Sequence, residues 1–333
     1  IKSGVSHAAS DRFNIVVHGR GGHAAVDPVH VSATSHTPPE ARQQQLYELT
    51  PSDPRSIGPF RCINRLKPGA EPINDDKPTP LLGQLPSPSA DGAPDFVVIK
   101  ILTGNPTPQG RIRLAEEHAW SQEQYVFRDG GADAEYSWVA RDFYQGVSLD
   151  QLIGRRGWTR ERSTTAARVI LVGIDRVHAA QEIHCDIKPA NVIVNARRAT
   201  LIDFESSRDH RENGFRAVEA TKPYASPEQL FGGGTVRPLT AATDLFSWAL
   251  TVCQMFAPGR HPYCLGSFDE DTMRAIDQAV LTGFAAPEPD LDGLPLGGLR
   301  DAVRKALSWR PEARGTARDL LVLLGETGSN TEV

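Results

Sequence analysis

Residues 183–194 read Ile183-His184-Cys185-Asp186-Ile187-Lys188-Pro189-Ala190-Asn191-Val192-Ile193-Val194. A carboxylate, an amine and a carboxamide come first, and the apolar run Val192–Val194 follows them at once. A second apolar run, Thr200–Ile202, ends directly before another carboxylate, Asp203. Two short apolar runs joined by a turn that contains Asn are typical of a β-hairpin. We therefore expect a hairpin here, with polar side chains on both sides of it.

The composition of the chain excludes several classes of protein. Its 333 residues are 39% hydrophobic and 23% charged, which is ordinary for a globular protein. The net charge of -5, without a dense Lys/Arg stripe, gives no reason to expect nucleic acid as a partner. The four cysteines include no Cys-x-x-Cys pair, which favours a reducing, cytoplasmic setting over a disulfide framework or a zinc site.

Membrane attachment within this chain is not expected, because no apolar run approaches the roughly 18–20 residues that span a bilayer. The first residues, Ile1 to Gly4, include no initiator Met, which suits a fragment of a longer protein. The sequence does not indicate an oligomeric state.

Changes in composition predict four parts along the chain. Residues 1–55 form an N-terminal extension that is largely irregular apart from the strand-like run Phe13–Val17. Residues 56–145 and 146–326 form two lobes, and 327–333 form a tail.

The two lobes differ in their expected secondary structure. The first holds one helical candidate, Gly110–Gln124, among short β-like runs, which are Phe60–Leu66, Leu81–Leu85, Phe96–Leu102 and Tyr136–Ala140. The second is mainly helical, with long helices expected at Thr164–Gln181 and Asp244–Met255.

The segment His184–Asn191 resembles the catalytic loop of protein kinases, whose pattern is His-x-Asp-x-Lys-Pro-x-Asn followed by a strand. Three further segments match in the right order. Phe96–Lys100 resembles the Val-Ala-Ile-Lys strand, Leu201–Glu205 the Asp-Phe-Gly motif, and Thr221–Glu228 the docking loop that ends in Ala-Pro-Glu. The resemblance covers residues from about 57 to 326. It implies an α+β, two-lobed, protein-kinase-like fold: a small antiparallel β lobe with one helix, and a larger, mainly α-helical lobe.

The resemblance also implies roles for the polar residues around the hairpin. Phosphoryl transfer needs a carboxylate to orient the attacking hydroxyl and positive charge on the transferring phosphate. Asp186 and Lys188 suit these two tasks as catalytic residues. Asn191 and Asp203 would supply the oxygen ligands that Mg2+ prefers.

Other residues would bind the nucleotide, ATP. Lys100 would hold the phosphates and pair with an acidic residue of the following helix, either Glu116 or Glu117; Glu117 fits better because Leu114 and Trp120 flank it on one face. The segment Asp142-Phe143-Tyr144 corresponds to the hinge that joins the lobes in kinases. Its backbone groups, at Asp142 and Tyr144, would bind adenine.

Downstream landmarks of the family are present as well. Asp244 matches the buried Asp of the helix after the docking loop, and Arg314 matches the Arg that pairs with Glu228. We expect Glu228 and Arg314 to form a buried bidentate ion pair with a structural role.

The sequence departs from the family pattern at four places. The loop Lys67–Pro72 has a single glycine where kinases carry Gly-x-Gly-x-x-Gly over the phosphates. Glu205 replaces the glycine of Asp-Phe-Gly, and Cys185 replaces the Arg of His-Arg-Asp, so regulation through that Arg is not expected. Arg141 stands where a hydrophobic gatekeeper is usual.

Residues 3–31 resemble a fragment of the dimerisation domain of hippurate hydrolase-type amidohydrolases. So short a segment cannot form that domain, and the metal ligands of that family are not found in this sequence. The resemblance therefore does not predict hydrolysis.

The sequence favours a protein serine/threonine kinase that transfers the γ-phosphate of ATP to a protein substrate. The alternative is a pseudokinase, a nucleotide-binding or scaffold module, for which Lys67–Pro72 and Glu205 speak. A small-molecule phosphotransferase of the aminoglycoside-kinase type is a third possibility, but it lacks the Lys-Pro pair and the docking loop.

Overall fold

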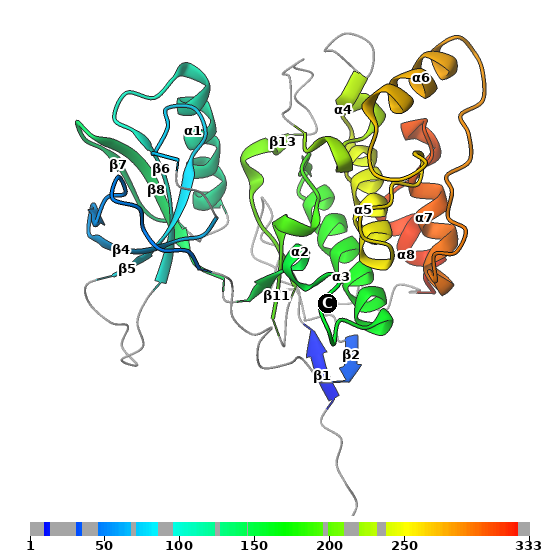
Figure 1. Ribbon diagram of the computed structural model, residues 1–333, viewed down its shortest axis with the longest axis horizontal. Helices are drawn as coiled ribbons and strands as arrows, with labels where there is room; N and C mark the ends of the chain where they lie inside the picture. The colour runs from blue at the N-terminus through cyan, green and yellow to red at the C-terminus, as the bar shows by residue number, and fades with distance from the viewer. Residues whose placement is uncertain are drawn as a thin grey trace, which may run out of the picture. The chain divides into compact units, whose positions relative to one another are not determined.

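The computed structural model describes residues 10–13, 31–34, 46–67, 71–85, 96–123, 127–144, 146–195, 199–209, 220–231 and 238–325. The chain divides into two compact units (Figure 1). The sheet unit consists of residues 43–145 and 203–205, and the helical unit of residues 1–42, 146–202 and 206–333. The sheet unit thus begins earlier in the sequence than the lobe that we expect from residue 56.

The sheet unit is built on six antiparallel strands in the order β3-β4-β5-β6-β8-β7. A central strand with alternating apolar residues buries one face, and a central strand with a continuous apolar run buries both faces. The core includes Phe60, Leu81 and Ile99, which are at most 1% exposed. The strand bounds are β3 Ser56–Ile57, β4 Phe60–Arg65, β5 Thr79–Gln84, β6 Phe96–Thr103, β7 Phe127–Ala132 and β8 Tyr136–Asp142.

Helix α1, Pro108–Glu123, is the one helix that packs on this sheet among the described residues, and it contacts β7 and β8 (Figure 1). It covers the predicted helix Gly110–Gln124, of which Gln124 lies outside the described residues. Leu114 and Glu117 face inward, at 9% and 0% exposure. The side chain of Trp120, expected on the same face, is also outside the described part.

Residues ahead of the first long strand belong to the sheet unit too. Tyr47 forms a β-bridge with Arg65, and the guanidinium of Arg65 binds the carboxylate of Asp53 at 2.6 Å and 2.7 Å. Both side chains are buried, so the pair is held in a low-dielectric setting. Farther upstream, β1 (Ser10–Phe13) pairs with β2 (Val31–Thr34) in the helical unit, and residues 14–17 of the predicted strand Phe13–Val17 lie outside the described part.

The helical unit is organised around α3 and α5, which lie against each other (Figure 1). The indole of Trp248 on α5 donates to the carbonyl of Ala167 on α3 at 2.9 Å. Helix α3 starts earlier than predicted because Thr159 caps its first turn through Arg162 N–H. The helix bounds are α2 Leu149–Leu152, α3 Arg160–Ala179, α4 Pro227–Phe231, α5 Ala241–Phe256, α6 Glu270–Leu281, α7 Arg300–Ala306 and α8 Ala317–Leu323.

Short strands position the loop His184–Asn191 of the helical unit. β11 (Val192–Val194) pairs with β12 (Ala199–Leu201) on one side and with β9 (Val147–Ser148) on the other, while β10 (Glu182–Ile183) pairs with β13 (Arg208–Asp209). The predicted hairpin is therefore present, shifted by one residue at its second strand. Gly146 enters β9 at φ 157°, where a side chain would meet Ile193.

The expected α+β division into an antiparallel sheet with one helix and a mainly helical part is confirmed by this arrangement. None of the described helices has the length and apolar character that a membrane crossing requires.

Candidate active site

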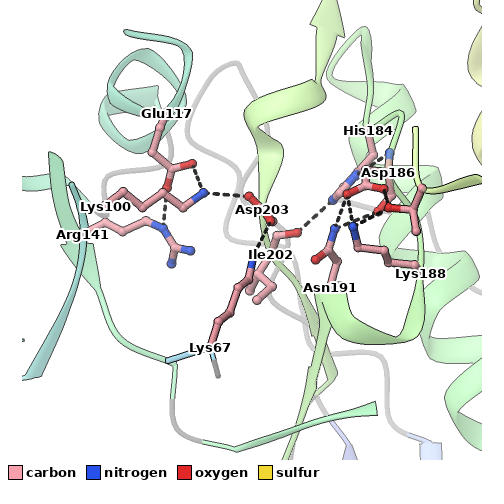
Figure 2. Close-up of polar contacts among 11 residues, drawn as sticks. Lys67, Lys100, Glu117, Arg141, His184, Asp186, Lys188, Asn191, Ile202 and Asp203 are labelled. Carbon is pink, nitrogen blue, oxygen red and sulfur yellow. Dashed lines mark hydrogen bonds and ion pairs between the residues drawn. The ribbon is translucent and has the colours of Figure 1, made fainter. Parts of the chain in front are cut away.

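The carboxylate of Asp186 lies at the centre of a small hydrogen-bonded cluster in the helical unit. Its Oδ2 accepts from Lys188 Nζ at 2.6 Å and from Asn191 Nδ2 at 2.9 Å (Figure 2). Its Oδ1 accepts from Thr221 Oγ1 at 2.9 Å. Lys188 Nζ also donates to Thr221 Oγ1 at 2.7 Å. The side chain of Asp186 is 12% exposed. The carboxylate of Asp186, the ammonium of Lys188 and the hydroxyl of Thr221 are therefore hydrogen-bonded to one another. The cluster is partly accessible to solvent.

The backbone of the loop that contains Asp186 is fixed by hydrogen bonds to Asp244 on α5. Its two carboxylate oxygens accept from the N–H groups of His184 and Cys185, each at 2.8 Å, and from His178 Nε2 at 2.9 Å. Asp244 is fully buried, as expected from the sequence. Cys185 takes a left-handed backbone conformation, φ 65°, which L side chains rarely adopt. The charge-assisted hydrogen bonds to Asp244 stabilise the strained backbone of Cys185 and so orient the next residue, Asp186.

Asn191 ends the 3-10 helix η2, Pro189–Asn191, and is 3% exposed. Its Nδ2 donates to the backbone carbonyl and to Oδ2 of Asp186, both at 2.9 Å, and its backbone carbonyl accepts from Ile202 N–H. Within the described residues no donor is recorded on its amide oxygen. An oxygen with no competing donor is a suitable ligand for a hard cation.

A second cluster of ionic side chains lies in the sheet unit. Lys100 of β6 extends its Nζ to Glu117 Oε2 at 2.9 Å and to Asp203 Oδ1 at 2.7 Å (Figure 2). Lys100 and Glu117 are buried, and the side chain of Asp203 is 17% exposed. Glu117, the better-fitting of the two candidates Glu116 and Glu117 on the helix, therefore contacts Lys100 as expected. Asp203 has φ 71°, a second strained position at a polar centre.

Arg141 of β8 completes this cluster. Its Nε donates to Glu117 Oε1 at 2.7 Å, so the two oxygens of Glu117 are divided between Arg141 and Lys100. Arg141 is 3% exposed. Burial opposes its charge, but the carboxylate of Glu117 raises the pKa of Arg141 above its ordinary value. The cation is therefore a fixed charge that ties β8 to α1.

The segment expected to bind adenine follows Arg141 directly. The carboxylate of Asp142 forms an ion pair with Arg128, and its carbonyl accepts from Arg141 Nη1 at 3.3 Å. Phe143 meets Phe96 edge to face with ring centroids 6.4 Å apart. Tyr144 is partly exposed. The roles of Asp142 and Tyr144 stay predictions.

The structure describes parts of two segments that depart from the family pattern, the loop Lys67–Pro72 and the residue Glu205. Lys67 is exposed, and its Nζ lies 3.9 Å from Asp203 Oδ2. In the rest of Lys67–Pro72, residues 68–70 lie outside the described part, and Arg65 donates to the carbonyl of Glu71 at 2.7 Å. The backbone of Glu205 forms part of the 3-10 helix η3, Phe204–Ser206, whereas its side chain is outside the described part.

The predicted ion pair between α4 and the segment before α8 is confirmed. Arg314 Nη1 and Nη2 lie 2.6 Å and 3.0 Å from the two oxygens of Glu228, and both side chains are fully buried. Arg314 also stacks on Phe246, 4.8 Å from the ring centroid. Burial favours a neutral carboxyl, but the charge of Arg314 lowers the pKa of Glu228.

A comparison with protein families identifies the chain. The family model described as "Protein kinase domain" matches residues 124–322 of this chain. These residues are more than half of the chain. The chain belongs to the protein kinase domain family.

The kinase domain has relatives among bacterial proteins. It is 30% identical over 287 residues to the probable serine/threonine-protein kinase PkwA of Thermomonospora curvata, an alignment that covers 83% of this chain and 35% of that protein. It is 26% identical over 287 residues to the serine/threonine-protein kinase AfsK of Streptomyces coelicolor, covering 82% and 32%. The serine/threonine-protein kinase PknA of Corynebacterium glutamicum is 26% identical over 196 residues, covering 56% and 41%.

The kinase domain thus spans about a third of the length of the first two of these relatives. Protein kinases act on protein substrates with ATP and a divalent metal ion, generally Mg2+. The family assignment predicted from His184–Asn191 is confirmed by the match.

The contacts of two residues in the kinase domain could not be anticipated from the sequence motifs. Thr221 appeared only as the start of the docking loop, yet its hydroxyl binds Asp186 and Lys188. Arg141 stood out only as an unusual gatekeeper, yet it binds Glu117. A charged residue within the apolar run of β8 was the available signal for Arg141, because a buried cation needs a partner.

Proposed function

We propose that the chain transfers the γ-phosphate of ATP to serine or threonine hydroxyls of a protein substrate. The observation that carries the proposal is the binding of Thr221 Oγ1 by Asp186 and Lys188. This hydroxyl donates to Asp186 Oδ1 at 2.9 Å and accepts from Lys188 Nζ at 2.7 Å. The cluster therefore accommodates an aliphatic hydroxyl in the way that a phosphate acceptor requires.

In this proposal Asp186 orients the attacking hydroxyl and accepts its proton. Carboxylate and hydroxyl must be within hydrogen-bond reach for such a transfer, and the distance to Thr221 meets that condition. Lys188 then places positive charge beside the transferring phosphate oxygens. Because Asp244 fixes the loop backbone, both side chains are oriented before substrate binds.

Lys100 and Glu117 would position the nucleotide phosphates, and backbone groups at Asp142 and Tyr144 would bind adenine. Asn191 and Asp203 would hold Mg2+, since an amide oxygen without a recorded donor and a partly exposed carboxylate are hard oxygen ligands. When bound, the metal ion neutralises charge on the nucleotide phosphates. Lys100 keeps one carboxylate oxygen of Asp203 in a fixed orientation.

We also propose a reducing, cytoplasmic setting and a protein partner without nucleic acid. The four cysteines all lie in the described part of the chain, and none of them forms a disulfide. This is the state expected where thiols are kept reduced.

The proposal is tested by incubating the chain with γ-labelled ATP, Mg2+ and a generic protein acceptor, comparing the wild type with Asp203→Ala. We expect label on serine or threonine with the wild type and none above background with the variant. Asp301→Ala, which removes a carboxylate that is 84% exposed on α7, is the matched control and should retain activity. Equal labelling by wild type and Asp203→Ala, or label on tyrosine alone, would reject the proposal.

A further inference from the structure

The side chain of Gln229 on α4 connects two loops of the helical unit (Figure 1 labels α4). Its Nε2 donates to the carbonyl of Cys185 at 2.6 Å, and its Oε1 accepts from the N–H of Ser226 at 3.0 Å. Cys185 belongs to the loop His184–Asn191, and Ser226 belongs to the docking loop Thr221–Glu228. One half-buried carboxamide therefore contacts both loops.

These two hydrogen bonds require both ends of a carboxamide. A backbone carbonyl can only accept and a backbone N–H can only donate, so the side chain between Cys185 and Ser226 must offer one donor and one acceptor. Glutamine offers both, whereas an ionised glutamate of the same length offers acceptors alone. The residue type at position 229 thus matches its two partners.

The contact with Cys185 acts on the residue that accepts the proton in the proposed function. The carbonyl of Cys185 and the N–H of Asp186 belong to one planar peptide group. Cys185 is strained at φ 65°, and Asp244 accepts from its N–H at 2.8 Å. With Gln229 bound to the carbonyl, hydrogen bonds hold the strained residue on both sides of its Cα atom. The peptide group that leads into Asp186 is thereby fixed in orientation.

The contact with Ser226 acts on the loop that begins with Thr221. Gln229 bonds to Ser226 twice, because its backbone N–H also donates to the Ser226 carbonyl at 3.0 Å. The hydroxyl of Ser226 is buried and has no hydrogen-bond partner among the described residues. Thr221, at the start of the same loop, binds Asp186 and Lys188. The two loops are therefore joined at two points.

A simpler explanation is that Gln229 only caps α4. A Gln three residues after a Ser fits the pattern of a capping box, in which the Gln side chain accepts from the Ser N–H. Such a cap uses Oε1 and makes no demand on Nε2. Here Nε2 binds Cys185, which is 44 positions away in the sequence. Capping and connection can be separated by experiment, because each uses a different atom.

The sequence offers little for a connection that depends on phosphate. Residues 208–220, which precede the docking loop, contain no serine, threonine or tyrosine. Cys185 carries no positive charge that could bind a phosphate, unlike the Arg of the family pattern. A neutral carboxamide provides a connection that requires no modification.

We propose that Gln229 is a positioning residue for phosphoryl transfer, which aligns Asp186 with the docking loop by binding Cys185 and Ser226 at once. It acts through the backbone and does not touch the reacting atoms. This inference rests on the proposed function, because it names what orients the base of that reaction. The alignment is made within the fold and is present before the acceptor binds.

Steady-state transfer of labelled phosphate to the generic protein acceptor tests the proposal with two variants of the full chain. Gln229→Glu keeps an acceptor for the Ser226 N–H and, at about pH 8, has no donor for Cys185, whereas Gln229→Leu lacks both. We expect kcat to fall about tenfold in Gln229→Glu, with the KM for ATP within about twofold of the wild-type value. Gln278→Glu, the same change at an exposed position on α6, should behave as the wild type does.

Hydrogen exchange of the backbone amides measures the same connection without phosphoryl transfer. In Gln229→Glu, exchange in residues 183–189 should be about tenfold faster than in the wild type, while residues 222–226 change little. In Gln229→Leu, both segments should exchange faster. Circular dichroism verifies that each variant is folded, and Gln229→Glu decides the test if Gln229→Leu does not fold.

The outcomes separate this inference from the proposed function. A wild type that transfers no label would reject the proposed function, and hydrogen exchange would then decide alone whether Gln229 holds the loop. With an active wild type, a wild-type kcat in Gln229→Glu would overturn the inference, since Gln229 would then serve only as a cap. Loss of ATP affinity in proportion to kcat would overturn it as well, because that points to a general disturbance of the fold.

Discussion

Arg141 differs most clearly, among the described residues, from what its position in the family pattern suggests. A hydrophobic gatekeeper would leave Glu117 to Lys100 alone, whereas here Glu117 binds two cations through separate oxygens (Figure 2). Glu117 is fully buried, so the loss of either cation would leave one of its carboxylate oxygens without that partner. Arg141 therefore acts as a positioning residue that fixes Glu117 and, through it, Lys100.

Replacing Arg141 with Leu should destabilise the sheet unit. Glu117 would keep Lys100 but lose its second partner, and breaking such a buried pair costs about 3–5 kcal/mol. Because Lys100 remains, we expect the lower end of that range in urea unfolding. Arg128→Leu is the control, since its ion pair with Asp142 is largely exposed. An Arg141→Leu protein as stable as the Arg128→Leu protein would contradict this role.

His261 makes the stability of the helical unit depend on pH. It is 2% exposed, its Nδ1 accepts from Tyr263 N–H at 3.3 Å, and its Nε2 has no partner among the described residues. Burial lowers the pKa of His261 from 6.5 to about 4. Between these values the unfolded chain binds a proton that the folded chain does not, so this contribution is fully present above pH 6.5 and is lost as the pH falls toward 4.

The loss attributable to His261 should reach about 3 kcal/mol. Urea unfolding of wild type and His261→Asn between pH 7 and pH 4 checks this, because Asn keeps an acceptor for Tyr263 N–H and does not titrate. The variant should show a flatter decline with falling pH. Parallel pH profiles for the two proteins would rule out His261 as a source of the dependence.

At the scale of elements, the ion pair of Glu228 with Arg314 connects α4 to the segment ahead of α8. Arg314 also donates to the carbonyls of Ala242 on α5 and of Trp309. One buried guanidinium thus satisfies acceptors on several elements at once. The sequence predicts the pair from the family pattern, but the carbonyl contacts depend on how the helices pack.

Glu228→Gln should leave Arg314 buried without a compensating charge and destabilise the helical unit by about 3–5 kcal/mol. Chemical denaturation provides the measurement. Glu270→Gln serves as the control, since Glu270 pairs with Lys222 and Arg274 on the surface and its loss should change stability little. Equal effects of the two substitutions would show that the buried pair does not stabilise the fold in this way.

For the whole molecule, local patterns predicted the elements and the polar loops well. Apolar runs separated by Pro and Gly marked β4, β5, β6 and β8, and the spacing within His184–Asn191 marked the loop that Asp244 holds. These features depend on residues that are close in sequence or fixed by a family motif. Strand β7 and helices α6, α7 and α8 were not predicted individually, and neither was the pairing of Asp53 with Arg65 in the sheet unit.

Contacts between distant residues could not be predicted from the sequence where no family motif pairs them. Arg141 and Glu117 are separated by 24 positions, and Thr221 and Asp186 by 35. Their pairing arises only when strands and helices have folded. The local sequence patterns around Arg141 and Thr221 do not indicate which distant side chains these residues contact.

Nucleotide binding by the whole chain is open to measurement in spite of the altered loop at Lys67–Pro72. Mg-ATP at about 100 times its dissociation constant should raise the stability by about 2.7 kcal/mol, visible as an increase in Tm. Removing the metal with EDTA should reduce the increase, and Lys100→Met should abolish it. An unchanged wild-type Tm would favour a pseudokinase without bound nucleotide.

The central claim is that Asp186 accepts the proton of a protein hydroxyl during phosphoryl transfer. The most direct test compares the rate of labelled phosphate transfer by wild type and Asp186→Asn at saturating Mg-ATP. The amide keeps the size of the carboxylate but cannot act as the base, so we predict a fall in rate of at least about 100-fold with the Mg-ATP increase in Tm retained. A variant that transfers phosphate within about twofold of the wild-type rate would contradict the claim.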